Sequence, residues 1–438
     1  MTSGEDDYWR EGTLTEVAGG ADIAVDESTP LQSWDGFGGA FNEKGWQVLL
    51  MLSDADRERA MRLLFGADGA NFAFGRIPIG ASDYALVRYT LCEAPCDATL
   101  DAFSIERDRE HLIPYIHAAL AVKPDIRFWA SPWTPPRWMK DNNAYDGGHM
   151  KSDGVTLDAY ARYLSRFVQA YAGEGINIEA VHPQTDPGYE QTYPSCLWSA
   201  DVMTEFIDTY LGPLFAQEHP NVQLWLGAMA NTNVAPSIVQ TVMSSTAAQY
   251  ITGLGLEWDM VAYADPFFQQ YSRPIMQTGH KGGNYPWVPD DYEDTAPNDH
   301  AYGVENWHLI KEWIESGVNS YMAWNMVLDN VGLSIDSGRD WAQNALLVVD
   351  PTLTTLIETP AYYVFRHFSA FIDPGARRLA TSGTAVEALA FRNADGSIIT
   401  VMYNPGATSR PTNLAVGGTT VQFEIPANGW ATVNWEPT

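Results

Sequence analysis

The feature that most constrains the fold is a regular alternation of short apolar runs and helical patterns, from about residue 36 to about residue 372. Helical patterns lie between several of the runs. SDADRERAMRLLF begins with a Ser-x-x-Asp cap, and TLDAYARYLSRFVQAYAGEG ends in glycine. Eight strands with intervening helices in one continuous stretch predict a closed (β/α)8 barrel, a TIM barrel, and not an open sheet. The eight strand-like runs are 36–41, 71–80, 126–133, 178–184, 222–230, 251–259, 274–279 and 320–328.

The last part of the chain has a different pattern. After Pro374 the runs RRLATSG, AVEALAFRN, SIITVMYNP, TNLAVGG, TVQFEIPAN and WATVNWE are short, β-rich and separated by turns. They predict an antiparallel β-sandwich of about 65 residues, which is small for that fold. LTEVAG and DIAVDES, near the N-terminus, are expected to complete it. We therefore predict a barrel over residues 34–372 and a β-sandwich side domain built from both termini, residues 1–33 and 373–438.

Composition excludes several kinds of partner. There are 25 Lys and Arg against 55 Asp and Glu, a net charge of −30. Nucleic acids and anionic membranes need a basic surface, so neither is expected to bind. No apolar run approaches the length of about 18 residues that would span a membrane. The acidic start, MTSGEDDYWREG, is not a signal peptide, which indicates a cytoplasmic protein or a secreted one whose leader has been removed.

No metal or cofactor is implied. The cysteines Cys92, Cys96 and Cys196 do not combine with histidines at zinc-ligand spacing. Cys92 and Cys96 could form a disulfide in a short loop, or both could be free thiols. The motifs H-E-x-x-H, G-x-S-x-G, the P-loop and the dinucleotide-binding glycines are absent. His182, on the fourth strand, is expected to be a hydrogen-bonded structural residue.

The ends of the predicted strands carry the candidate functional residues. In a (β/α)8 barrel the working residues lie at the C-terminal ends of the strands. Aromatic residues make up 12% of the chain, and they either fill the core or line a cleft that stacks on sugar rings. Acids and aromatics that converge on one rim therefore predict a carbohydrate cleft, unless they only pack the barrel mouth. These strand-end residues are Glu43, Arg76, Asp83, Trp133, Asp186, Trp258, Gly279, Trp324 and Asn325.

Five segments carry a specific resemblance: WDGFGGAFNEKGW, GRIPIGASDYALVRYT, WASPWTPPRWMK, VHPQTDPGYEQTYPSCLW and SYMAWNMVLDNVG. They resemble segments of glycoside hydrolase family 30, which includes glucosylceramidases and β-1,6-glucanases, and they run in the right order over most of residues 34–345. The resemblance implies a (β/α)8 barrel with a β-sandwich built from both termini. It also implies retaining hydrolysis of a β-linked glycoside, in the first place a β-glucoside, with one Glu after strand 4 and another after strand 7.

The resemblance also assigns roles at the sugar subsite. Asp83 and Trp133 are expected to bind the nonreducing-end sugar, and Arg76 is expected to order the carboxylates. Trp258 would add an aromatic wall. The remaining candidates for contact with the sugar are Thr185, Tyr189, Trp324 and Asn325.

At the catalytic positions the chain departs from the family. Thr185-Asp186 stands where Asn-Glu is expected before proline. Asp186 keeps a carboxyl group but is one methylene shorter, and a displacement of about 1 Å can cost about a hundredfold in rate. Thr185 offers one hydroxyl where the family's Asn bonds the sugar 2-hydroxyl. The family's second Glu is Gly279, and no acid follows until Asp290, so the usual nucleophile is missing.

Three hypotheses remain open. In the leading one the protein is a glycoside hydrolase with altered chemistry. Gly279 leaves room for a water, Asp186 is the proton donor, and another carboxylate is the base of an inverting reaction. Glu257 is the first candidate base, unless it only bonds a neighbouring polar group, and Asp259 and Glu43 follow. The alternatives are a sugar-binding protein that does not cleave, and a variant whose nucleophile has been replaced. The expected partner is a carbohydrate, and the sequence does not predict the oligomeric state.

Overall fold

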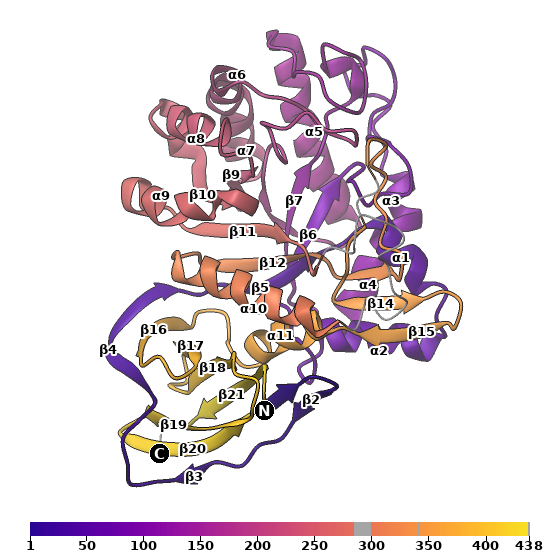
Figure 1. Cartoon of the computed structure of the whole chain (residues 1–438). Coiled ribbons are helices and arrows are strands. Elements are labelled where there is room, and N and C mark those ends of the chain that lie inside the picture. Colours follow the sequence, from indigo (N-terminus) through magenta and orange to yellow (C-terminus); the bar gives the residue numbers. More distant parts are fainter. Residues whose placement is uncertain (284–298, 340–341, 437–438) are drawn as a thin grey trace.

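The computed structural model describes residues 1–283, 299–339 and 342–436. Its larger part is a closed barrel of parallel strands (Figure 1). Each strand pairs with the next along the chain, and β12 pairs with β5 to close the ring. The predicted (β/α)8 barrel is therefore confirmed. Its strands are β5 (Gly36–Ala40), β6 (Phe74–Ile79), β7 (Arg127–Pro132), β8 (Ile178–Val181), β9 (Gln223–Met229), β10 (Ile251–Leu256), β11 (Ile275–His280) and β12 (Ser320–Asn325).

Helices alternate with the strands along the chain. α2 begins as its sequence predicts, because Ser53 Oγ accepts a hydrogen bond from the Asp56 N–H at 3.1 Å. α5 ends at Gly173, two residues before Gly175, the glycine predicted to stop it. The helices are α1 (Glu43–Leu49), α2 (Asp54–Phe65), α3 (Glu106–His111), α4 (Ile113–Val122), α5 (Gly154–Gly173), α6 (Ala200–Glu205), α7 (Gly212–Glu218), α8 (Ala235–Met243), α9 (Ala264–Tyr271), α10 (His300–Glu315) and α11 (Pro360–Ser369). Among the described helices, none is long and apolar enough to cross a membrane.

A ten-stranded sheet, below the barrel in Figure 1, combines both ends of the chain. β4 pairs antiparallel with β16 and parallel with β19, so an N-terminal strand lies among C-terminal ones. The sheet confirms the predicted β-sandwich built from both termini. Strands β1 and β2, within MTSGEDDYWREG, were not predicted. The strands are β1 (Thr2–Gly4), β2 (Asp7–Arg10), β3 (Thr15–Glu16), β4 (Ile23–Ser33), β16 (Arg377–Ser382), β17 (Glu387–Arg392), β18 (Ile398–Asn404), β19 (Arg410–Val416), β20 (Thr419–Ile425) and β21 (Gly429–Trp435).

A small three-stranded sheet divides the predicted run 320–328 into two strands. The chain leaves the barrel at Met326, whose carbonyl oxygen accepts from the Leu347 N–H at 3.0 Å. The Met326 side chain lies over Gly39, where an added Cβ would be 2.3 Å from Met326 Cγ, so a glycine is needed for this close approach. The strands of the small sheet are β13 (Val327–Asp329), β14 (Leu347–Asp350) and β15 (Thr355–Glu358).

Two expectations about single side chains are resolved by the fold. The cysteines are free thiols, and the Cys92 thiol donates to Asp97 Oδ2 at 3.4 Å instead of pairing with Cys96. His182 is buried in the barrel with its ring 4.3 Å from the Trp129 ring. Neither of its ring nitrogens has a hydrogen-bond partner in the described part of the chain, so the expected hydrogen-bonded role is wrong. Burial holds the pKa of His182 well below its ordinary value.

A buried carboxyl on α3 predicts pH-dependent stability. Asp108 accepts hydrogen bonds from the hydroxyls of Tyr89 and Tyr171, both at 2.8 Å, and burial raises its pKa to about 7 from 3.8. The Asp108 carboxyl therefore binds its proton more tightly in the folded protein than in the unfolded chain. The stabilisation that the protonated carboxyl gives the fold is present below about pH 4 and is lost as pH rises through 7. We expect Asp108→Asn, which cannot ionise, to gain up to about 4 kcal/mol relative to wild type between pH 4 and pH 8. Urea unfolding at both pH values measures the gain, and a difference that does not change with pH would contradict the prediction.

Candidate active site

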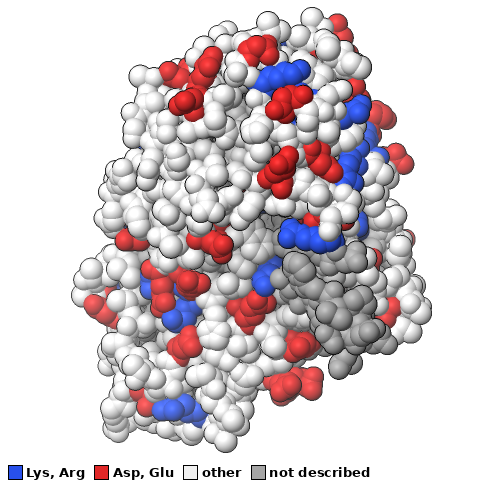
Figure 2. All heavy atoms as spheres, turned by 45° about the horizontal axis from the view of Figure 1, so that its top comes forward, with Lys and Arg blue, Asp and Glu red and all other residues white. Residues whose placement is uncertain are grey.

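A pocket at the C-terminal ends of the barrel strands gathers most of the predicted site residues. It is a small hollow, with an empty volume of about 320 Å³ when its opening to solvent is included. On the face shown in Figure 2, acidic side chains are scattered and do not form one patch. The pocket is lined by Arg76, Asp83, Trp133, Thr185, Asp186, Tyr193, Glu257, Trp258, Gly279 and Trp324.

Two carboxyl groups meet inside the pocket. Asp186 follows β8 and Glu257 follows β10, and their carboxyls lie within hydrogen-bonding range of each other. Glu257 Oε2 also accepts from Thr278 Oγ1 at 3.0 Å and from Arg76 Nη1 at 3.4 Å. Burial, and next the negative charge of Glu257, hold the pKa of Asp186 well above its ordinary value. Asp186 therefore keeps its proton to a higher pH than an ordinary carboxyl does, next to the Glu257 carboxyl group.

Arg76, on β6, is buried under the pocket and connects its walls. Its guanidinium donates to the Thr278 carbonyl oxygen at 3.2 Å and to Thr185 Oγ1 at 3.0 Å. The guanidinium carbon lies 4.4 Å from the Trp133 ring centroid and 5.1 Å from that of Trp324. The cation therefore compensates the Glu257 charge and supports the aromatic walls at the same time.

Aromatic rings and one further acid form the walls. Trp133 and Trp324 stack with ring centroids 5.1 Å apart. The Asp83 side chain accepts from the Trp324 indole, and burial raises the pKa of Asp83 to about 7. Asp83 Oδ1 and Asp186 Oδ1 are enclosed but have no hydrogen-bond partner among the described residues. Flat apolar rings beside unpartnered oxygens are what a sugar, with its C–H faces and hydroxyls, requires.

Gly279 and Thr185 offer a ligand few groups to bind. A Cβ at position 279 would lie 3.0 Å from Arg76 Nη1 and 3.3 Å from Glu257 Oε2. The Thr185 hydroxyl accepts from Arg76 and bonds Ser131 Oγ at 3.0 Å. The hydroxyl is therefore committed to the protein, and the glycine leaves room for the Arg76–Glu257 pair.

The backbone is left-handed at two residues of the pocket. Asp186 has φ 48° and Trp258 has φ 52°. Such angles are uncommon outside glycine, more so for a bulky residue than for Asp, and they cluster at functional sites. Both residues lie shortly after a barrel strand, β8 or β10, in the segments that carry the two carboxyls.

Several predicted residues do not line the pocket. Tyr189 is half-buried and follows Asp186 in the same turn, whereas Tyr193, which was not predicted, lines the wall. The Asn325 amide donates to Gln343 Oε1 at 2.9 Å, and its oxygen accepts from Asn42 at 3.0 Å.

Of the other candidate bases, none reaches the pocket in the described residues. Glu43 Oε2 accepts from the Leu86 N–H at 2.7 Å and from Arg107 at 3.0 Å, so this carboxylate is held away from the pocket. Asp259 is exposed. Asp290 lies outside the described residues.

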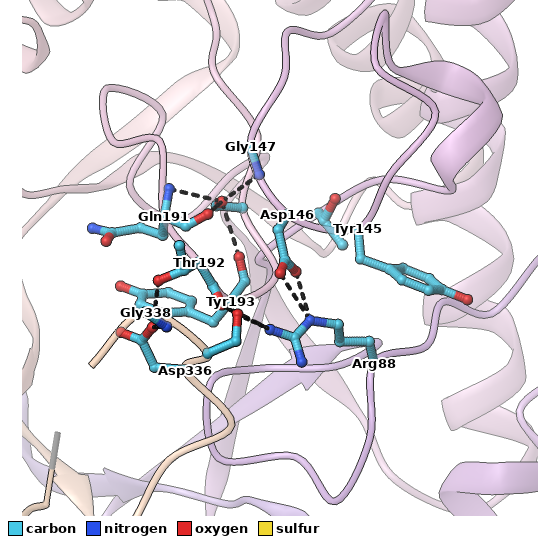
Figure 3. Close-up of polar contacts among 12 residues, drawn as sticks. Arg88, Tyr145, Asp146, Gly147, Gln191, Thr192, Tyr193, Asp336 and Gly338 are labelled. Atoms are coloured by element: carbon cyan, nitrogen blue, oxygen red, sulfur yellow. Dashed lines mark hydrogen bonds and ion pairs between the residues drawn. The ribbon is translucent and has the colours of Figure 1, made fainter. Parts of the chain in front are cut away.

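Loops from four barrel strands hold the rim of the pocket in place (Figure 3). Arg88, in the loop after β6, donates to Asp146 Oδ1 at 2.8 Å and to the Thr192 carbonyl oxygen at 2.7 Å. It also reaches Ser337 Oγ at 3.4 Å, in the loop beyond β13. Because Tyr193 follows Thr192, these contacts position a pocket-lining side chain.

The family follows from comparison with known sequences. A family model described as the glycosyl hydrolase family 30 TIM-barrel domain matches residues 34–372, and one described as the family 30 beta sandwich domain matches residues 375–433. This chain therefore belongs to glycosyl hydrolase family 30, as its five segments indicated.

Relatives and solved structures agree with this assignment. The lysosomal acid glucosylceramidase of Mus musculus is 28% identical over 412 residues, covering 90% of this chain and 79% of that protein. Endo-1,6-beta-D-glucanase neg1 of Aspergillus fumigatus is 25% identical, covering 87% and 81%. The crystal structure of SrfJ from Salmonella typhimurium superposes with a TM-score of 0.86 at 25% identity, covering 98% of this chain and 95% of that one.

Proposed function

We propose that the protein is a hydrolase of β-linked glycosides of glucose configuration, with Asp186 as the proton donor. The observation that supports this most is the contact between Asp186 and Glu257 at the base of a pocket with stacked tryptophan walls. A carboxyl that stays protonated can give its proton to a departing glycosidic oxygen. The two relatives are named as a glucosylceramidase and an endo-1,6-beta-D-glucanase, and both names refer to substrates that contain glucosyl units.

The test is a panel of aryl β-glycosides with the first-formed anomer followed by NMR. We expect turnover of a gluco-configured member and little turnover of its α-linked counterpart. An inverted product would support attack by water with Glu257 as the base, and a retained product would exclude it. Absence of turnover across the panel would contradict the proposal.

One observation favours a second candidate, a protein that binds sugar without cleaving it. No side chain at position 279 can act as a nucleophile. This candidate predicts saturable sugar binding with no product, whereas a hydrolase gives both.

Trp133→Ala is expected to weaken sugar binding by about tenfold under either candidate, because the ring is one of the stacked walls. Isothermal titration with a β-glucoside at low temperature measures the change. Phe268→Ala is the control, since Phe268 is 39% exposed and outside the pocket. Equal affinities for wild type and Trp133→Ala would place the sugar elsewhere.

A further inference from the structure

The spacing of the two carboxyls restricts the chemistry of the pocket. Asp186 and Glu257 line the same pocket, and the two carboxyls are hydrogen-bond partners. Retaining enzymes with a protein nucleophile separate their carboxyls by about 5–5.5 Å, and inverting enzymes by about 6.5–9.5 Å to admit a water. A pair in contact fits neither arrangement. It fits the substrate-assisted route, in which the substrate carries its own nucleophile and no gap between the carboxyls is required.

Strand β11 supplies no replacement for the missing side chain. Residues 275–283 contain no Asp or Glu. Gly279 does not have a left-handed backbone conformation, so glycine is not needed there for its flexibility. An added Cβ would be 3.3 Å from Glu257 Oε2 and 3.7 Å from Trp324 Cε3. The glycine thus gives space to the Glu257 carboxylate and leaves an aromatic wall beside it, against which an uncharged group of the ligand can pack.

Glu257 is oriented as a hydrogen-bond acceptor for a ligand. Arg76 and Thr278 Oγ1 both bind Oε2, which fixes the carboxylate from one side, while the residue lines the pocket on the other. The neighbouring Thr185 hydroxyl is already bonded to Arg76 and Ser131. Glu257 is therefore better placed than Thr185 to receive an N–H group of the sugar.

We propose that the substrate is a 2-acetamido-2-deoxy-β-glucoside whose acetamide carbonyl oxygen is the nucleophile, an inference that rests on the glycosidase function proposed above. In the first step this oxygen bonds to C1 while the C1–O bond to the aglycone breaks. Asp186 gives its proton to the departing oxygen, and Glu257 accepts the amide proton, which leaves a neutral oxazoline fused to the sugar.

The second step returns both carboxyls to their starting states. Asp186 takes a proton from water, and the water oxygen bonds to C1 as the C1–O bond of the oxazoline breaks. Glu257 returns its proton to the nitrogen. The product keeps the β configuration, and no bond to the protein forms at any stage.

The first experiment uses the wild-type protein with two aryl glycosides that differ only at C2. We expect kcat/KM for the 2-acetamido-2-deoxy-β-glucoside to exceed that for the β-glucoside by about a hundredfold or more, because an intramolecular nucleophile is already in position. Among substrates with one, two or three fluorines on the acetamide methyl, the rate should fall with each fluorine, since fluorine draws electrons from the attacking oxygen. A rate that is unchanged along this series would overturn the inference.

A second measurement does not depend on turnover. The thiazoline analogue of the oxazoline should bind at least about a hundredfold more tightly than the parent 2-acetamido sugar, as an intermediate analogue does. Glu257→Gln should lower the affinity for the thiazoline by a much larger factor than the affinity for the parent sugar. Asp259→Asn, an exposed acid outside the pocket, is the control.

The outcomes separate this inference from the proposed function. Faster cleavage of the β-glucoside than of the acetamido sugar would overturn the inference and leave the hydrolase intact. A covalent adduct on Glu257 after incubation with a 2-deoxy-2-fluoro glucoside would also overturn it, because the protein would then supply the nucleophile. If neither substrate is cleaved and neither sugar binds, the hydrolase proposal fails as well.

Discussion

Asp186→Asn is expected to lower kcat/KM by about 10²–10⁴-fold for a β-glycoside with a poor leaving group, the range that a lost general acid produces. With a dinitrophenyl leaving group the loss should be small, because that oxygen departs without a proton. The pKa of Asp186 in the wild type is held well above its ordinary value. The rate of the wild-type protein should therefore fall only as pH rises through that raised value. The variant should lack this fall. Rates for both leaving groups across pH measure the effect.

The variant is suited to this test because asparagine tolerates the left-handed backbone at this position, where φ is 48°. A large activity loss would therefore reflect the missing proton and not an altered turn. Asp259→Asn is the matched control, since Asp259 is an exposed acid in the loop after β10. An equal loss for good and poor leaving groups would show that Asp186 does not act as the acid.

The barrel could be predicted because each of its strands and helices has a pattern that is visible within a short stretch of sequence. Each buried strand is a short apolar run, and eight such runs with helices between them have few other ways to pack. The small sheet of β13, β14 and β15 could not be predicted in the same way. β13 follows β12 after one residue, and its pairing with β14 joins segments that are distant in the sequence. No periodicity within either segment specifies that contact.

The site also has a part that the sequence predicted and a part that it did not. Barrel geometry brings strand ends together, which is why Arg76, Asp83 and Trp133 could be placed at one pocket from sequence alone. Asp186 and Glu257 lie in segments with left-handed backbone, at Asp186 itself and at Trp258, and no residue pattern predicts these angles. Tyr193 was missed for a related reason, because it lies in a loop held by Arg88 and not on a strand.

The polar interior of the barrel was the least predictable part. Asn325 follows the pattern of a pocket residue, yet its amide is occupied by Gln343, in a segment whose position depends on the small sheet. His182 was expected to form hydrogen bonds. Its buried ring instead packs against aromatic neighbours, and its nitrogens have no hydrogen-bond partner among the described residues. The hydrogen-bond partners of buried polar side chains depend on tertiary contacts, which the spacing of residues in the sequence does not predict.

Arg76→Ala is expected to lower the free energy of unfolding by about 3–5 kcal/mol, the cost of removing one member of a buried ion pair. The guanidinium is 1% exposed and lies 3.4 Å from Glu257 Oε2. Without it Glu257 remains a buried carboxylate beside Asp186, with Thr278 Oγ1 as its hydrogen-bond donor. The stacked rings of Trp133 and Trp324 would lose the cation beneath them as well. Urea unfolding followed by tryptophan fluorescence measures the loss.

Two further variants show whether the charge or only the lost volume causes the effect. Glu257→Gln combined with Arg76→Ala removes the unpaired carboxylate, so the double variant should be more stable than Arg76→Ala alone. Arg10→Ala breaks an ion pair with Asp7 in which both side chains are more than half exposed, and should cost at most about 1 kcal/mol. If the double variant recovered nothing, packing would account for the loss. If Arg76→Ala itself cost no more than Arg10→Ala, the buried cation would not be the element that holds the pocket together.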